Sequence, residues 1–314
     1  MVRENGYVNW DDTLKKLGID TTSLDTVMGS DKVTVIKGSR SNVFSFKHDG
    51  NNLFFKTNLI GGEEFYYAEL LAEELAKDYG IPCASYDLAK ICGHTGVISK
   101  DIRKENATYI NLKDIIKMYH GEVINNFDLL TISKDLNNYY KNRENREEIL
   151  ATLYSQIIDI FIFDVLVAQF DPFNLMIMED NGKVSMAPIF DNEYMQWKDR
   201  KTGFHFGVDE KLDSKDKDRA LIAFDRFLSI SNDVFIKKVV DKMWIIGENN
   251  LEAKFGVIER KTGSIIEKQF VPTPVPPDIK NRFMTMFNDY RKKLIEVLNK
   301  HIEVPIVENG RIKK

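Results

Sequence analysis

The chain has few of the residues that build disulfide or metal frameworks. Its 314 residues include two cysteines, Cys83 and Cys92, and five histidines. Two cysteines do not make a disulfide framework, so reduced thiols in a cytosolic protein are the simpler interpretation. The histidines are scattered, without the spacing of paired metal ligands, which argues against a structural zinc site.

An excess of one charge and a long uninterrupted apolar run are also lacking. The net charge is −4, so no overall basic field points to nucleic acid. The most apolar stretch, 157–170, is interrupted by Asp159 and Asp164 and is too short to span a bilayer. Residues 1–12 carry no apolar signal-peptide core. We expect a cytoplasmic protein that binds neither nucleic acid directly nor a membrane, with secretion by a route without a signal peptide left open.

The chain does contain ample material for a folded core. Hydrophobic residues make up 43% and charged residues 29%, a profile typical of a globular protein with one large domain or two lobes. Small helical pieces are expected over residues 1–30. Three strand-like runs, VTVI, VFSF and LFFK, then follow within 32–58, broken by GSRSN and by the turn signal DGNN. Residues 61–82 have helical spacing, and 83–102 predict two further strands.

The remainder of the chain is predicted to be mostly helical, with one hairpin. The expected helices cover 110–123, 127–140, 147–170, 217–230, 232–246 and 279–302. Two short apolar runs within 174–192 flank Asn181-Gly182, which is a strong hairpin signal. Residues 198–218 are charged and irregular, and 271–277 (VPTPVPP) form a stiff connector. These patterns predict a bilobal α+β protein with the layout of a protein kinase: a nucleotide-covering sheet lobe, 1–102, and a helical catalytic lobe, 103–314.

Phosphoryl transfer needs a cation for the phosphates, and one lysine fits that need. Lys56 ends the apolar run LFFK, so its ammonium group must find a partner or leave the core face. Glu69 lies at the edge of the apolar arc of the following helix, where a Lys–Glu pair reaching ATP would account for both residues. Glu64 is a rival partner, although a glutamate in the first turn also serves the helix dipole. A solvated strand-end lysine and a solvated glutamate remain the alternative.

The loop between the first two strands is a candidate cover for the phosphates. Gly38 permits close approach of the backbone, and the consecutive N–H groups of 38–42 are able to face a phosphate. An ordinary hairpin loop explains the same residues equally simply.

Three polar residues surround the predicted hairpin in the order that a kinase site requires. Asp171 ends the apolar helix, Asn174 opens the hairpin and Asp191 closes it. Because a hairpin brings its ends together, Asn174 and Asp191 are expected side by side as Mg²⁺ ligands. Asp171 would then stand just before them as the catalytic base. Taken singly, each residue has a simpler explanation: Asp171 as a helix cap, Asn174 as a turn residue and Asp191 as an aspartate at a strand end.

Three segments resemble the HipA-like serine/threonine kinase family: AELLAEELAKDYGIPCASYDL, FDVLVAQFDPFN and MAPIFDN. The resemblance covers most of 30–200 and is to the compact members of that family, which include small toxin kinases. It assigns Lys56 and Glu69 to the nucleotide-binding lysine and its helix partner, Asp171 to the base, and Asn174 and Asp191 to Mg²⁺.

The same resemblance implies further features that the residues alone do not. Backbone groups of Ser99 and Lys100 would contact adenine. The cofactors that the resemblance implies are ATP and Mg²⁺. Ser39 and Ser41, with Gly38, would belong to the nucleotide-binding loop, and the two serines are candidate autophosphorylation sites, unless they only tune the turn. The expected partners are a protein substrate and an antitoxin-like protein.

One departure from the family pattern leaves the function open. The family loop reads Asp-Arg-His-x-x-Asn, whereas this chain reads Asp171-Pro172-Phe173-Asn174 and is two residues shorter. Kinases generally hold the base and the asparagine about five residues apart. An autophosphorylating serine/threonine protein kinase is therefore the leading hypothesis, beside a pseudokinase that binds nucleotide as a module and a lipid or small-molecule kinase.

Overall fold

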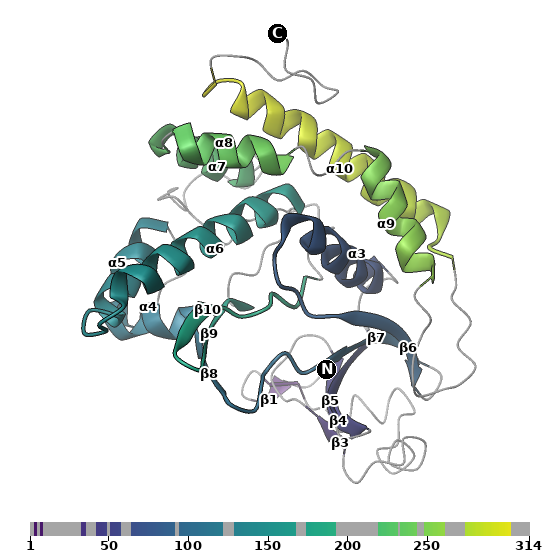
Figure 1. The fold of residues 1–314 in the computed structure, drawn as a ribbon. Coiled ribbons are helices and arrows are strands. Elements are labelled where there is room, and N and C mark those ends of the chain that lie inside the picture. Colours follow the sequence, from purple (N-terminus) through teal and green to yellow (C-terminus); the bar gives the residue numbers. More distant parts are fainter. Residues whose placement is uncertain are drawn as a thin grey trace.

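The computed structural model describes thirteen stretches of the chain. They are residues 3–4, 7–8, 33–35, 42–48, 51–57, 64–91, 94–121, 129–167, 174–192, 219–231, 233–243, 248–260 and 274–302. Small antiparallel sheets lie on one side of the molecule and a larger helical part on the other (Figure 1). The α+β architecture predicted from the sequence is therefore confirmed.

A five-stranded antiparallel sheet forms the smaller part. Its strands are β3 (Val33–Val35), β4 (Asn42–His48), β5 (Asn51–Thr57), β6 (Tyr86–Ile91) and β7 (His94–Lys100), in the order β3-β4-β5-β7-β6. Helix α3 (Glu64–Tyr79) connects β5 to β6 and packs on β6 and β7. Its apolar arc is buried as the spacing predicted, and the β-β-β-α-β-β order is the predicted one.

The first residues differ from the prediction. Helical pieces were expected over 1–30, but β1 (Arg3–Glu4) and β2 (Tyr7–Val8) pair as a two-stranded antiparallel ladder. The intervening Asn5-Gly6 dipeptide is a hairpin turn signal, which favours strand pairing over a helix start. The helical pieces expected over the remainder of 1–30 lie outside the described residues.

A second sheet carries the predicted hairpin. Strands β9 (Met176–Asp180) and β10 (Lys183–Met186) pair around Asn181 and Gly182, whose φ angles of 51° and 77° are those of a tight hairpin turn. A third strand, β8 (Ala107–Asn111), pairs with β9. The prediction missed β8 and began a helix at 110, although Thr108, Tyr109 and Ile110 are typical strand residues.

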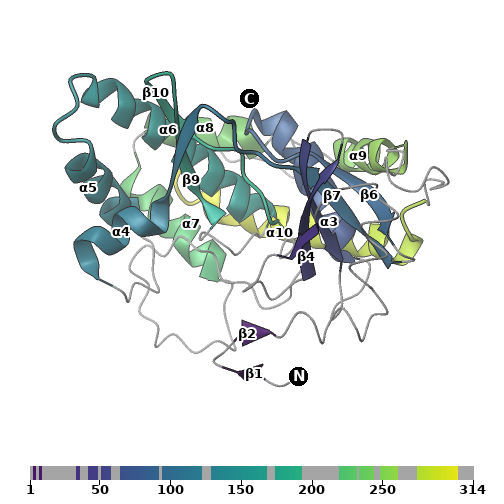
Figure 2. The ribbon, with the colours of Figure 1, turned by 90° about the horizontal axis from the view of Figure 1, so that it is seen from below.

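The larger part is otherwise helical. Its helices are α4 (Leu112–His120), α5 (Leu129–Tyr139), α6 (Arg146–Val167), α7 (Arg219–Ile230), α8 (Asp233–Met243), α9 (Glu248–Arg260) and α10 (Pro277–Leu298). Figure 2 shows the sheet of β4, β6 and β7 and helices α4 and α5 at opposite ends of the molecule. Within the described residues, no helix is both long and apolar enough to cross a membrane.

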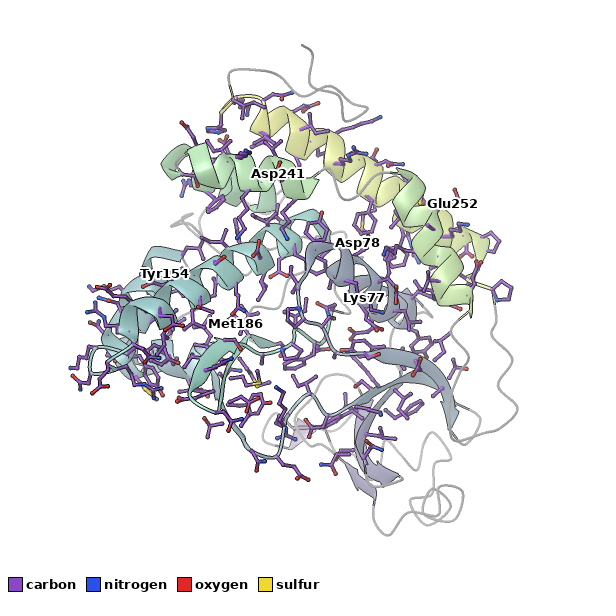
Figure 3. All side chains as sticks on the ribbon, viewed as in Figure 1. Lys77, Asp78, Tyr154, Met186, Asp241 and Glu252 are labelled. Carbon is purple, nitrogen blue, oxygen red and sulfur yellow. The ribbon has the colours of Figure 1, made fainter. Side chains whose placement is uncertain are left out.

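Helix α9 was not predicted and packs directly on α3. Leu251, Phe255 and Ile258 are buried at helical spacing along it. The Lys254 Nζ lies 2.6 Å from Asp78 Oδ1 at the end of α3. Figure 1 shows α9 on the outer side of α3, and Figure 3 marks Asp78 there. Helix α3 is thus enclosed between the five-stranded sheet and the C-terminal helices.

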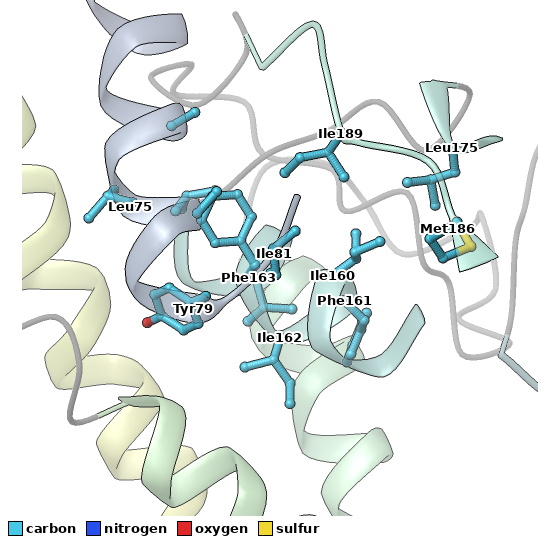
Figure 4. Packing of buried hydrophobic residues seen from close by; sticks show 14 of the residues in the cluster. Leu75, Tyr79, Ile81, Ile160, Phe161, Ile162, Phe163, Leu175, Met186 and Ile189 are labelled. Atoms are coloured by element: carbon cyan, nitrogen blue, oxygen red, sulfur yellow. The ribbon is translucent and has the colours of Figure 1, made fainter. Parts of the chain in front are cut away.

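One continuous core joins the two parts. Figure 4 shows Tyr79 of α3 beside Phe163 of α6, and both belong to one buried apolar cluster. The rings of Tyr79 and Phe163 meet edge to face with their centroids 5.5 Å apart. Leu175, Met186 and Ile189, from the two ends of the hairpin, complete the cluster. The hairpin ends are therefore fixed against both α3 and α6.

Candidate functional site

A cavity of about 470 Å³ lies between the five-stranded sheet and the hairpin. The wall on the sheet side includes Val43, Phe54 and Val97, and the wall on the hairpin side includes Met176 and Phe190. Charged and amide groups converge on it from both sides. The size, the apolar walls and the few polar groups are typical of a small-molecule binding site.

Lys56 enters this cavity because of the strand alternation of β5. Phe54 and Lys56 share the face of the sheet that lines the cavity, whereas Phe55 between them is buried on the other face. The register places Lys56 between Val43 of β4 and Val97 of β7, which line the cavity beside it. The apolar run that required a partner for Lys56 therefore aims the ammonium group at the cavity.

The partner of Lys56 is the predicted glutamate. Lys56 Nζ donates to Glu69 Oε1 over 2.8 Å, and the glutamate side chain is 1% exposed. The second oxygen, Oε2, accepts the backbone N–H of Asn192 over 2.7 Å. Burial raises the pKa of Glu69, and the positive charge of Lys56 opposes that rise. The side chain of the rival Glu64 lies outside the described residues.

The two predicted metal ligands meet at the ends of the hairpin. Asn174 Nδ2 donates to Asp191 Oδ2 over 3.0 Å, and Lys56 also contacts Asp191 Oδ1. The backbone bond from Ala187 N to Met176 O, 2.8 Å long, extends the hairpin pairing toward this point. The structure therefore brings Lys56, Glu69, Asn174 and Asp191 together at one side of the cavity.

The donor set suits Mg²⁺ rather than a soft metal. Asn174 and Asp191 offer an amide oxygen and a carboxylate, and Mg²⁺ prefers oxygen ligands from one or two carboxylates completed by phosphates and water. Over the described stretches, no group of three or more His, Cys, Asp or Glu side chains is arranged to hold a metal. The pair thus fits a metal that arrives together with a phosphate ligand.

Ser99 and Lys100 line the rim of the cavity, where β7 leaves the sheet. The chain then passes through Asp101 and Arg103, which are joined by a bidentate ion pair with a 2.8 Å bond from Nη2 to Oδ2. Burial would raise the pKa of Asp101, but the hydrogen bonds from Arg103 outweigh it and lower that pKa. The ion pair therefore stabilises the short connection between the two sheets.

Several predicted site residues have no described position. Gly38, Ser39 and Ser41 of the predicted phosphate loop lie outside the described residues, and so does Asp171. The structure therefore leaves their predicted roles as predictions.

Sequence reasoning missed three residues that surround the site. Asn192 donates its N–H to Glu69, as described above. Tyr86 Oη accepts the backbone N–H of Asp191 over 3.0 Å, and burial, followed by the nearby charge of Glu69, raises the pKa of Tyr86. Glu73 Oε2 accepts the backbone N–H of Tyr86 over 2.9 Å. Glu73 follows Glu69 by one helical turn, and this spacing was the one available signal.

Comparisons with known proteins place this geometry in a known fold. The sequence matches no protein-family model, and a search of curated proteins returns no match. The Helicobacter pylori proinflammatory kinase CtkA superposes with a TM-score of 0.59 and 15% identity, over 85% of this chain and 93% of that chain. HipA of Shewanella oneidensis MR-1, from a toxin–antitoxin complex with HipB and operator DNA, gives a TM-score of 0.50 and 11% identity, over 94% and 71%. The chain therefore has the protein-kinase-like fold, as the sequence predicted.

Proposed function

We propose that the chain is an ATP- and Mg²⁺-dependent serine/threonine protein kinase of HipA-like type. The observation that carries the proposal is the convergence of Lys56, Glu69, Asn174 and Asp191 at one cavity. These residues come from a strand, a helix and the two ends of a hairpin, so polar side chains scattered independently over a surface would not meet in this way. The protein-kinase-like fold supports the same reading.

Each side chain has a distinct part in the proposed reaction. Lys56, held by Glu69, would bind the α- and β-phosphates, and Asn174 and Asp191 would hold Mg²⁺. When bound, Mg²⁺ would neutralise the charge that the transferred phosphoryl group develops. Asp171 would accept the proton of the substrate hydroxyl. The hydroxyl oxygen would then bond to the γ-phosphorus while the bond from that phosphorus to the β-phosphate oxygen breaks, and ADP would leave.

The cavity walls suit the remainder of the nucleotide. Phe54, Val97 and Met176 offer apolar surface for a flat ring, and Ser99 and Lys100, whose backbone groups are the proposed partners of adenine, also line the cavity. Ser39 and Ser41 are the proposed autophosphorylation sites. An antitoxin-like protein is the proposed partner.

The short Asp171–Asn174 loop supports one alternative, a pseudokinase that binds nucleotide without transferring phosphate. The base and the metal-binding asparagine are three residues apart instead of about five. Such a protein would be stabilised by nucleotide through mass action alone. A lipid or small-molecule kinase would use the same four residues on another substrate.

The proposal is tested by incubating the purified chain with Mg²⁺ and γ-labelled ATP and mapping the label by mass spectrometry. Asp171→Asn and Asp191→Asn serve as matched controls, because each removes one charge at nearly constant size. We expect label on serine or threonine in the wild type and none in either variant. Asp171→Asn should still bind ATP.

The other outcomes separate the alternatives. Nucleotide-induced thermal stabilisation without any label, on this chain or on a panel of proteins, lipids and small molecules, would indicate a pseudokinase. Label that appears only on a lipid or small molecule would replace the protein substrate in the proposal. Equal labelling in Asp171→Asn would exclude Asp171 as the base.

A further inference from the structure

Asp191 has a backbone conformation that few residues other than glycine adopt, although aspartate adopts it more often than most. Its φ of 62° lies in the left-handed region, where residues other than glycine are uncommon. A residue persists in that region only when its surroundings hold it there, and such residues gather at functional sites. The contacts that hold Asp191 therefore bear on how the carboxylate is aimed.

Two successive backbone N–H groups anchor the segment Asp191–Asn192, which we call the Asp191 turn. The N–H of Asp191 is donated to Tyr86 Oη over 3.0 Å, and the N–H of Asn192 is donated to Glu69 Oε2 over 2.7 Å. The segment just before them is also fixed, because Ala84 N donates to Ile189 O and Ile189 N donates to Pro82 O, each over 2.8 Å. The turn is thus attached to the chain that links α3 to β6.

Tyr86 is itself held rigidly. Its backbone N–H is donated to Glu73 Oε2 over 2.9 Å, its residue is 5% exposed, and its register on β6 places it opposite Ser99 of β7. Glu73 also accepts from Ser85 Oγ over 3.0 Å. Glu69 and Glu73 are one turn apart on α3. Glu69 therefore holds the Asp191 turn directly, and Glu73 holds it through Tyr86.

We propose that Tyr86 is a positioning residue for the metal site: by accepting the Asp191 N–H, its hydroxyl keeps the Asp191 carboxylate turned toward Asn174. The metal part of this inference rests on the proposed function, whereas the hydrogen bond does not. Groups that orient metal ligands typically change metal affinity by tenfold to a hundredfold when removed. Tyr86 would thus set the Mg²⁺ requirement of the site without touching the metal.

Tyr86→Phe tests this role because it removes the hydroxyl and keeps the buried ring. Tyr154→Phe is the matched control, since Tyr154 Oη donates to Ser133 O over 2.9 Å in the helical part of the molecule (Figure 3). The first measurement is hydrogen exchange of the peptide that contains 187–192. The second is the Mg²⁺ concentration that gives half of the ADP-induced thermal stabilisation.

We expect faster exchange in the peptide that contains 187–192 and about a tenfold higher Mg²⁺ midpoint in Tyr86→Phe, with neither change in Tyr154→Phe. Faster exchange with an unchanged midpoint would overturn the positioning role and leave a structural bond only. Unchanged exchange would overturn the inference at its origin. If the wild type shows no Mg²⁺-dependent stabilisation by ADP, the proposed function and the metal role both fail, while the exchange result still decides whether the bond exists.

Discussion

Lys56 and Glu69, thirteen residues apart in the sequence, are joined by a 2.8 Å hydrogen-bonded ion pair that connects strand β5 to helix α3. The lysine side chain is 13% exposed and the glutamate side chain 1%. A carboxylate this deeply buried is costly unless it is paired, so each residue accounts for the position of the other. Lys56 also contacts Asp191, which extends the link to the hairpin.

Replacing Lys56 with methionine should destabilise the fold as well as abolish nucleotide-dependent activity. The change leaves Glu69 buried without its cation, and breaking such a pair costs about 3–5 kcal/mol. Urea denaturation measures the loss. The double variant Lys56→Met/Glu69→Gln should recover part of the stability and none of the activity, because the charge that needed a partner is gone.

A matched lysine on the surface provides the control for this result. Lys104 pairs with Asp180 over 2.7 Å, but its side chain is 60% exposed. Lys104→Met should therefore leave the unfolding midpoint unchanged, because solvent screens such pairs. If Lys56→Met were as stable as Lys104→Met, the Lys56–Glu69 pair would have no structural importance.

Asp191→Asn should remove the response to Mg²⁺ while leaving some nucleotide binding. An asparagine at this position keeps the size of the side chain but loses the negative charge that a divalent cation requires. Thermal stabilisation by ADP, measured with and without Mg²⁺, should differ in the wild type and coincide in the variant. A variant with a wild-type Mg²⁺ response would show that Asp191 is not a metal ligand.

Gly96→Ala should displace β5 next to Lys56. A Cβ at position 96 would lie 2.4 Å from the carbonyl oxygen of Lys56 and 2.7 Å from the ring of Phe55, which is buried. Such overpacking typically costs about 1–3 kcal/mol. We expect lower stability and weaker ADP binding together, measured by urea denaturation and calorimetry. Wild-type stability would mean that β5 and β7 separate there without cost.

Phe255→Ala tests the support that α9 gives to α3. The Phe255 side chain is fully buried, and truncation of a buried phenylalanine costs about 3–5 kcal/mol. Glu252, exposed on the same helix and marked in Figure 3, offers Glu252→Ala as a control with little expected effect. If urea denaturation gives both variants the same stability, α9 does not contribute to the core as its packing indicates.

The sequence predicted the parts of this fold whose signals are local. The Asn181-Gly182 turn and the apolar arc of α3 encode their elements directly, and the hairpin in turn predicts that Asn174 and Asp191 meet. The chemistry of an apolar strand lysine likewise predicts a buried partner for Lys56. The observed contacts agree with both expectations.

The missed features depend on contacts between distant segments. Strand β8 exists because it pairs with β9, and no turn signal marks it as a third strand. Helix α9 contains Gly256, which lowers helical propensity, and its buried arc became recognisable only against α3. Tyr86 bonds Asp191, 105 residues away, through a hydroxyl group and a backbone N–H, and no spacing rule predicts such a bond.

The central claim is that the cavity beside Lys56 and Asp191 is a Mg²⁺–nucleotide site. Isothermal calorimetry of a non-hydrolysable ATP analogue, with and without Mg²⁺, tests it most directly because it requires no substrate and no turnover. We predict binding by the wild type that is stronger with Mg²⁺, little binding by Lys56→Met, and Mg²⁺-independent binding by Asp191→Asn. Absence of binding by the folded wild type at millimolar analogue and Mg²⁺ would contradict the claim.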